Sequence, residues 1–107
     1  MKNLINRYTY REEWSEEDSA YISRCLEFPS LAAYGSTPEE ALAEIKSVVQ
    51  FVLVDMEAGG EEIPEPFGLR KYRGNLSLRV PADIHRHLAI QAAEQGVSIN
   101  QLILSRL

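Results

Sequence analysis

The 107-residue sequence contains very little cysteine and histidine, with one cysteine and two histidines. Cys25 has no second cysteine to pair with, so we expect no disulfide and a cytoplasmic, reducing setting. His85 and His87 share one short stretch, and no zinc-binding spacing surrounds them. The sequence therefore predicts no metal site and no cofactor.

Long apolar runs are also absent. No stretch approaches the roughly 18–20 apolar residues of a membrane-spanning helix, and residues 1–7 lack the apolar core of a signal peptide. The composition, with 45% hydrophobic and 25% charged residues, is that of a soluble globular protein without a membrane partner. The length suits one ordinary domain or two very small ones.

Positive charge is scarce in the first two thirds of the chain. Residues 1–70 contain six lysines and arginines against fourteen aspartates and glutamates, whereas residues 71–107 contain five against two. The net charges are therefore −8 and +3. This asymmetry indicates different partners for the two parts, a basic protein for the acidic part and nucleic-acid phosphate for the basic part.

The N-terminal part is predicted to form a small antiparallel sheet. Aromatic and β-branched residues favour strands over 7–12, 20–27 and 31–35. We expect a polar turn over 13–19 and an interruption of the strand at Pro29 and Ser30. Three antiparallel strands can support one another where two would be marginal.

A long amphipathic helix follows the predicted sheet. Thr37 suits the N-cap, Pro38 the first helical position and Glu40 the third, as in a capping box. Apolar residues then recur at a spacing of three or four, at Leu42, Ile45, Val48, Val49, Val52, Leu53 and Met56. Gly59 and Gly60 should end the helix after about 21 residues, and its apolar stripe should lie along the sheet.

Residues 75–80 have the alternating pattern of a single β-strand. The apolar residues point to one side and the polar residues to the other: Leu76, Leu78 and Val80 against Asn75, Ser77 and Arg79. Pro81 ends the strand and begins a helix, so no hairpin partner follows. An unpaired strand invites a second copy. The two-stranded antiparallel ribbon of such a dimer would fit the major groove of DNA.

Two short helices are predicted after the strand. Each has a narrow apolar stripe, comprising Ile84, Leu88 and Ala92 in the first helix and Ile99, Leu102, Ile103 and Leu107 in the second. Gly96 suits the left-handed residue that ends the first helix, and Ser98 suits the N-cap of the second, which would have about nine residues. Such stripes are too small for a core alone but adequate for four helices from two chains.

The segments Asn75-Leu-Ser-Leu-Arg-Val-Pro81 and Gly96-Val-Ser-Ile-Asn-Gln101 resemble the ribbon-helix-helix fold of small bacterial repressors. The whole chain resembles a HicB-family antitoxin. The resemblance implies an α+β fold. An acidic, partial RNase H-like, toxin-binding domain would occupy residues 1–66, a linker residues 67–74, and a ribbon-helix-helix domain residues 75–107. It also allows a short fourth strand near Ile63.

The resemblance implies an antitoxin of a type II toxin–antitoxin pair. It would bind and occlude a small, basic, HicA-like RNA-cleaving toxin and would repress its own operon through operator DNA, as a homodimer or higher oligomer. The residues expected to read bases are Asn75, Ser77 and Arg79, and those expected to contact phosphate are Ser98, Lys71 and Arg73. The predicted dimer core is Leu76, Leu78, Val80, Ile84, Leu88, Ile99, Leu102 and Ile103.

The toxin-contacting residues are not identified by the sequence. Phe51 and Val54 lie on the otherwise polar face of the long helix and are candidates, although scattered exposed apolar residues are common.

Other interpretations stay open. Residues 75–80 would alternatively form an ordinary edge strand of the N-terminal sheet. The N-terminal domain would alternatively sense a small molecule for a stand-alone ribbon-helix-helix regulator, or be a vestigial nuclease. The candidate metal-holding carboxylates of such a nuclease are Glu12, Glu27, Glu40 and Glu44. Cys25 has no nearby histidine to serve as its base, and we expect no catalysis.

Overall fold

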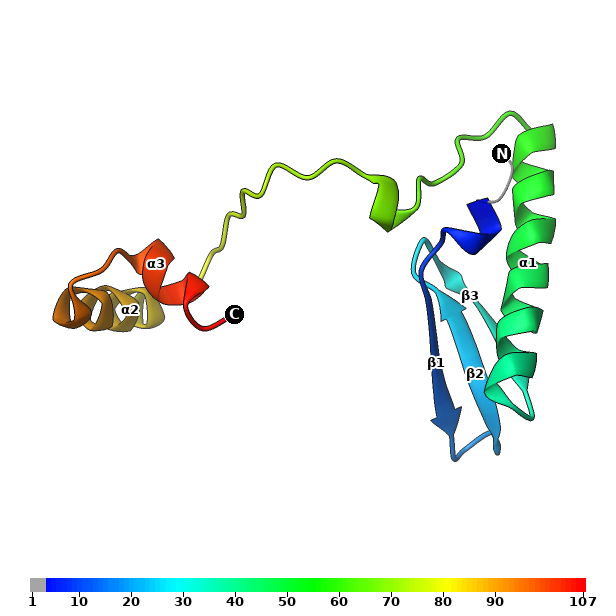
Figure 1. Cartoon of the computed structure of the whole chain (residues 1–107), viewed down its shortest axis with the longest axis horizontal. Helices are drawn as coiled ribbons and strands as arrows, with labels where there is room; N and C mark the ends of the chain where they lie inside the picture. Colours follow the sequence, from blue (N-terminus) through cyan, green and yellow to red (C-terminus); the bar gives the residue numbers. More distant parts are fainter. Residues whose placement is uncertain (1–3) are drawn as a thin grey trace. The chain divides into compact units, whose positions relative to one another are not determined.

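The computed structural model describes residues 4–107, which form two compact units. The first unit extends to Lys71 and the second runs from Tyr72 to Leu107, so the division falls inside the predicted linker 67–74. Figure 1 shows the elements of each unit. No helix in residues 4–107 combines the length and apolar character needed to cross a lipid bilayer.

The first unit is a three-stranded antiparallel sheet covered on one face by a helix. The strands are β1 (Tyr10–Ser15), β2 (Ala20–Cys25) and β3 (Phe28–Gly35), in the spatial order β1-β2-β3. A short 3-10 helix, η1 (Leu4–Asn6), precedes them, and helix α1 (Pro38–Ala58) lies along the sheet (Figure 1). The predicted α+β class is confirmed.

The strand boundaries differ from the prediction for two physical reasons. β1 extends to Ser15 because Trp14 packs edge-to-face against Tyr21 across the hairpin, with ring centroids 5.1 Å apart, so the turn is shorter than predicted. Pro29 was expected to interrupt the third strand but lies within β3. β3 is at the edge of the sheet, where a missing N–H is tolerated, and the pairing shifts register at Arg24/Cys25.

Helix α1 begins and ends at the predicted residues. The Thr37 side chain accepts a hydrogen bond from the Glu40 N–H at 3.0 Å. The Glu40 carboxylate accepts from the N–H and the hydroxyl of Ser36, both at 2.9 Å, so the reciprocal bond closes on the residue before the N-cap. Gly35 packs beneath this turn, where an added Cβ would collide with the backbone nitrogen of Ala41.

The core of the first unit lies between α1 and the sheet. Ile45, Val49 and Leu53 of α1 are buried against a sheet-side cluster that includes Cys25 and Phe28. Ile63 packs against this core without forming a strand, so the fourth strand allowed near it is not present in residues 4–107.

Residues 61–71 are attached to the first unit. The Tyr8 hydroxyl donates to the carbonyl oxygen of Pro64 at 2.8 Å, and Pro66 is fully buried. Phe67 begins the 3-10 helix η2 (Phe67–Leu69), and its N–H donates to the Glu27 carboxylate at 2.9 Å. The guanidinium of Arg70 lies 3.9 Å from the centroid of the Phe67 ring. This segment is therefore held by specific contacts up to the end of the unit.

The second unit contains helix α2 (Ala82–Gln95) and helix α3 (Ile99–Leu104), which pack against each other. Gly96 has φ +70°, the left-handed conformation expected at the end of α2. Ser98 caps α3 as predicted. α3 has six residues rather than about nine, so it contributes less apolar surface than the sequence indicated.

Candidate nucleic-acid interface and partner surfaces

Residues 75–79 are exposed and Val80 is half-buried, so none of them belongs to a buried core. In the single chain they form no strand, and their backbone groups make no hydrogen bond within residues 4–107. Leu76 is 94% exposed and Leu78 is 73% exposed. The polar residues of the alternation, Asn75, Ser77 and Arg79, are exposed as well. The segment therefore does not pair with the three-stranded sheet of its own chain, and its side chains do not point into an apolar interior.

The turn between α2 and α3 is built by local hydrogen bonds. The N–H of Val97 donates to the carbonyl oxygen of Ala92 at 2.9 Å, which closes the end of α2 around Gly96. The Ser98 hydroxyl oxygen accepts from the Gln101 N–H at 3.0 Å, and the Ser98 N–H donates to Gln101 Oε1 at 2.9 Å. This capping box fixes the α2–α3 corner, which holds the predicted phosphate contact at Ser98.

The buried apolar residues of the second unit are few. Only Ala92 on α2 and Leu102 on α3 are buried among its apolar residues, at 3% and 1% exposure. The other members of the predicted dimer core are exposed or half-buried in the single chain: Leu76, Leu78, Val80, Ile84, Leu88, Ile99 and Ile103. Ile90, Val97 and Leu104 add further exposed apolar surface that the sequence analysis did not include. One copy of this unit therefore leaves most of its apolar side chains in water.

The predicted phosphate contacts at the boundary between the two units are accessible. Lys71 and Arg73 are exposed on either side of Tyr72, and Gly74 follows with φ +79°. Together with Arg79 they place three cations close in sequence to the exposed segment.

The four glutamates considered as metal ligands of a nuclease do not form a metal-binding cluster within residues 4–107. Residues 4–107 contain no group of three or more histidine, cysteine, aspartate or glutamate side chains able to hold a metal ion. Glu40 bonds to Ser36 at the helix start. Glu27 is buried at 7% exposure and has a different role, which the sequence analysis missed.

Glu27 joins three segments of the first unit. Its carboxylate accepts hydrogen bonds from the N–H and the hydroxyl of Thr9, at 2.9 and 3.0 Å, and from the N–H of Phe67 at 2.9 Å. Burial alone favours the neutral acid, but these hydrogen bonds outweigh it and hold the pKa of Glu27 below its ordinary value. A carboxylate satisfied in this way stabilises the fold and is not free to act in catalysis.

Cys25 is also a structural residue. Its side chain is fully buried in the core, and burial raises the pKa of the thiol to about 11. The thiol is therefore protonated at neutral pH and is a poor nucleophile.

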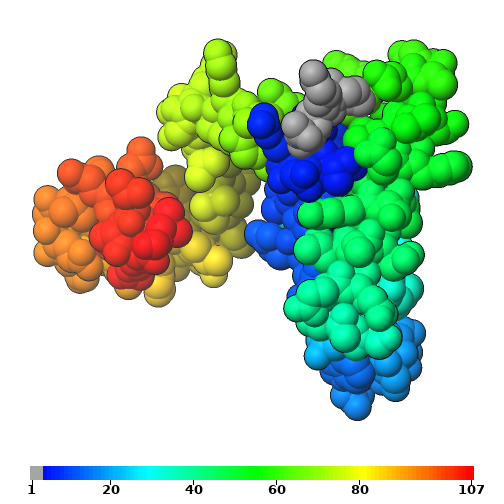
Figure 2. Space-filling model, turned by 45° about the vertical axis from the view of Figure 1, so that its right-hand side comes forward, coloured from blue at the N-terminus to red at the C-terminus, as the bar shows by residue number. Residues whose placement is uncertain are grey.

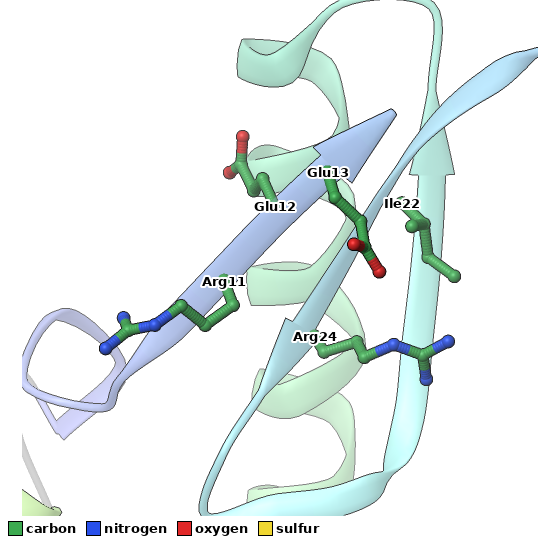
Figure 3. Close-up of a pocket in the computed structure, with 5 residues that line it drawn as sticks. All are labelled: Arg11, Glu12, Glu13, Ile22 and Arg24. Atoms are coloured by element: carbon green, nitrogen blue, oxygen red, sulfur yellow. The ribbon is translucent and has the colours of Figure 1, made fainter. Parts of the chain in front are cut away.

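The open face of the sheet, opposite α1, carries a hollow of about 230 Å³. It is lined by Arg11, Glu12, Glu13, Ile22 and Arg24. Figure 3 shows the two guanidinium groups pointing to opposite sides, with Glu13 between the strands. None of the four charged side chains is buried. The hollow thus lacks the enclosed, convergent polar groups typical of a small-molecule site, and it does not favour the sensor alternative.

Phe51 and Val54 lie on α1, where they are 75% and 56% exposed. They take no part in the core between α1 and the sheet. Among residues 4–107, they are the two large apolar side chains of α1 that are exposed.

A model of the HicB family matches residues 58–107, just under half of the chain. The match supports HicB-family membership, and at the family level it points to the antitoxin of a toxin–antitoxin pair, a class that is generally not enzymatic. No curated protein and no solved structure matches the chain. The matched residues run from the end of α1 through the whole second unit.

Proposed function

We propose that this chain is the antitoxin of a type II toxin–antitoxin pair with two separate binding activities. The second unit dimerises, binds operator DNA as a ribbon-helix-helix protein and represses its own operon. The first unit binds and occludes a small, basic, HicA-like RNA-cleaving toxin. The chain performs no chemistry itself.

One observation carries the DNA-binding part of this proposal. An alternating segment in the region matched by the HicB family exposes Leu76 almost completely and Leu78 largely, and its backbone has no hydrogen-bond partner within residues 4–107. Fully burying a leucine side chain contributes about 1.5–3 kcal/mol, so a monomer that holds two leucines in water has a strong drive to associate. Antiparallel pairing of residues 75–80 between two copies would satisfy the backbone and bury both leucines.

The same pairing determines what faces outward. Because side chains alternate along a strand, burying the leucines turns Asn75, Ser77 and Arg79 to the opposite side of the ribbon, once from each chain. Arginine and asparagine form bidentate hydrogen bonds with guanine and adenine edges in the major groove. The two-fold symmetry of the ribbon then requires an inverted-repeat operator.

Contacts to the DNA backbone come from the flanks of the ribbon. At the α2–α3 corner the Ser98 cap leaves its hydroxyl hydrogen and the first amides of α3 available to a phosphate oxygen. Lys71 and Arg73 add positive charge just before the ribbon. These contacts set affinity and orientation, whereas the ribbon residues set sequence preference.

The toxin-binding part is supported by charge. Residues 1–70 carry a net charge of −8, which steers a basic partner and repels nucleic acid. Occlusion by such a surface is steric and electrostatic.

Substitution of Arg79 tests the DNA-binding activity. Arg79→Ala should weaken operator binding by about 1–3 kcal/mol and relax specificity at one base position per half-site, because it removes a base-edge contact. The matched control is Arg106→Ala, at an exposed arginine in the turn after α3, which should change affinity little. Both are measured by titration of labelled operator at several salt concentrations. Equal effects of the two substitutions would place the ribbon outside the groove.

The toxin-binding activity is tested by co-expression with the product of the adjacent gene. A small basic protein that co-purifies with this chain and arrests growth when expressed alone is the expected result. An adjacent product that neither binds nor arrests growth would contradict the antitoxin assignment.

A further inference from the structure

The outer face of α1 has an exposed aromatic anchor. Phe51 is 75% exposed, the most exposed aromatic side chain in residues 4–107, and Val54 is 56% exposed one turn further along the helix. The two side chains lie on the same side of the helix because residues three apart are neighbours on its surface. Figure 2, turned so that α1 (green) comes forward, shows its atoms as a continuous surface along the first unit. Together Phe51 and Val54 place two large apolar side chains side by side on an exposed helix face, where a protein partner could bury them.

The charge around this anchor is of one sign. With 3.6 residues per turn, Glu44 and Asp55 lie within roughly 40° of Phe51 around the helix axis, and both are exposed. The single lysine of α1, Lys46, lies on the other flank, where its ammonium group donates to Asn6 Oδ1 at 3.2 Å and stands 5.7 Å from the Tyr10 ring centroid. Carboxylates thus flank Phe51 along the helix, and the one cation of the helix is directed elsewhere.

These charges distinguish between the possible occupants of the face. A second copy of the chain would bring Glu44 and Asp55 against the same carboxylates, and like charges in an interface are strongly unfavourable. Nucleic acid would be repelled for the same reason. A basic protein with an apolar pocket would bury Phe51 and Val54 while its cations pair with the flanking carboxylates.

We propose that the outer face of α1, defined by Phe51, Val54, Glu44 and Asp55, is the docking site for a small basic protein. Phe51 is the central anchor, Val54 extends the apolar contact and the two carboxylates steer the partner. This inference rests on the proposed function, because the partner it names is the toxin of the pair. It adds the surface on which that toxin is held.

The experiment uses the full chain and, as the probe, the purified product of the adjacent gene. Phe51→Ser combined with Val54→Ser should weaken binding about 30-fold or more, as for central interface anchors. The matched control is Tyr34→Ser, which is 50% exposed on the sheet face opposite α1. It should leave affinity within about 3-fold, by the behaviour of residues outside an interface. Both variants should keep the circular dichroism spectrum and melting temperature of the parent, because these side chains are outside the core.

Charge reversal provides a second measurement. Glu44→Lys combined with Asp55→Lys should slow association at low salt about 10-fold or more, and the difference should shrink at high salt. Three results would overturn the inference. If the probe binds the parent and the Phe51/Val54 variant equally, the toxin docks elsewhere and only the docking site is wrong. If the probe does not bind the parent, the proposed function fails with it. If the Phe51/Val54 variant loses self-association in sedimentation, the face belongs to a second copy.

Discussion

The two units of this chain bury their apolar residues to very different extents. The first unit encloses a core in which Ile45 and Val49 are completely buried, and it anchors its own trailing segment through Glu27 and Pro66. The second unit buries Ala92 and Leu102 and leaves Leu76, Leu78, Ile84, Ile90 and Leu104 substantially exposed. From this difference we expect the first unit to fold on its own and the second to need a further surface to complete its core.

The largest expected effect is on the association of the second unit. Leu78→Ser should destabilise a dimer by about 3–6 kcal/mol, since two leucine side chains each contribute about 1.5–3 kcal/mol when buried. Sedimentation equilibrium and operator binding would measure the loss. Leu26→Ser, at a leucine 43% exposed in the first unit, is the control. An unchanged dimer in Leu78→Ser would remove the contrast between the units.

A slightly smaller effect is expected in the core of the first unit. Ile45→Ala should lower its free energy of unfolding by about 2–5 kcal/mol, because the side chain is completely buried and its removal leaves a cavity. The change should not depend on protein concentration, unlike the change at Leu78. Denaturant titration at two concentrations would test this, and a concentration-dependent midpoint would show that the first unit also relies on a second copy.

The Glu27 network should contribute about 1.5–3 kcal/mol, the range for hydrogen bonds to a charged group. The pKa of Glu27 is lowered in the folded state, so this contribution is fully present above the ordinary value of 4.5 and is lost as pH falls through the folded value. Glu27→Gln should therefore destabilise the first unit near neutral pH, with a difference from the parent that shrinks below about pH 4.5. Thermal unfolding across pH 3–8 would measure it. A constant difference would assign the effect to packing.

The smallest effect is expected at the α2–α3 corner. Ser98→Ala should destabilise α3 by about 1 kcal/mol, because it removes the side-chain cap. Amide exchange of the α3 residues would report the change, and Ser98→Thr should restore most of the protection. Equal exchange in all three proteins would mean that packing alone holds α3.

The sequence predicted the elements whose ends carry specific chemistry. The bounds of α1 were predicted correctly from Thr37, Pro38 and the Gly59-Gly60 pair. The turn between α2 and α3 was predicted correctly from Gly96 and Ser98. Both cases are local, because capping side chains bond within one turn of themselves. The residues assigned to base reading, phosphate contact and the dimer core stay predictions.

The features that the sequence could not predict depend on contacts between distant segments. A proline in the sequence predicts the end of a strand. Pro29 is accommodated within β3 because β3 lies at the edge of the sheet, where a missing N–H is tolerated. Glu27 reads as a candidate metal ligand, but its partners include Phe67, forty positions away. Nothing in the spacing of the residues gives that pairing, and the attachment of residues 61–71 follows from it.

Because Cys25 is completely buried and is the single cysteine of the sequence, its labelling rate can serve as a probe of opening of the first unit. A maleimide dye can react with it only when α1 lifts from the sheet, so the labelling rate reports how often that happens. Toxin bound across α1 would lower the labelling rate of Cys25, whereas operator DNA bound to the second unit would leave that rate unchanged. Because buried Cys25 reacts slowly, a second cysteine introduced at an exposed position could be labelled selectively without first removing Cys25.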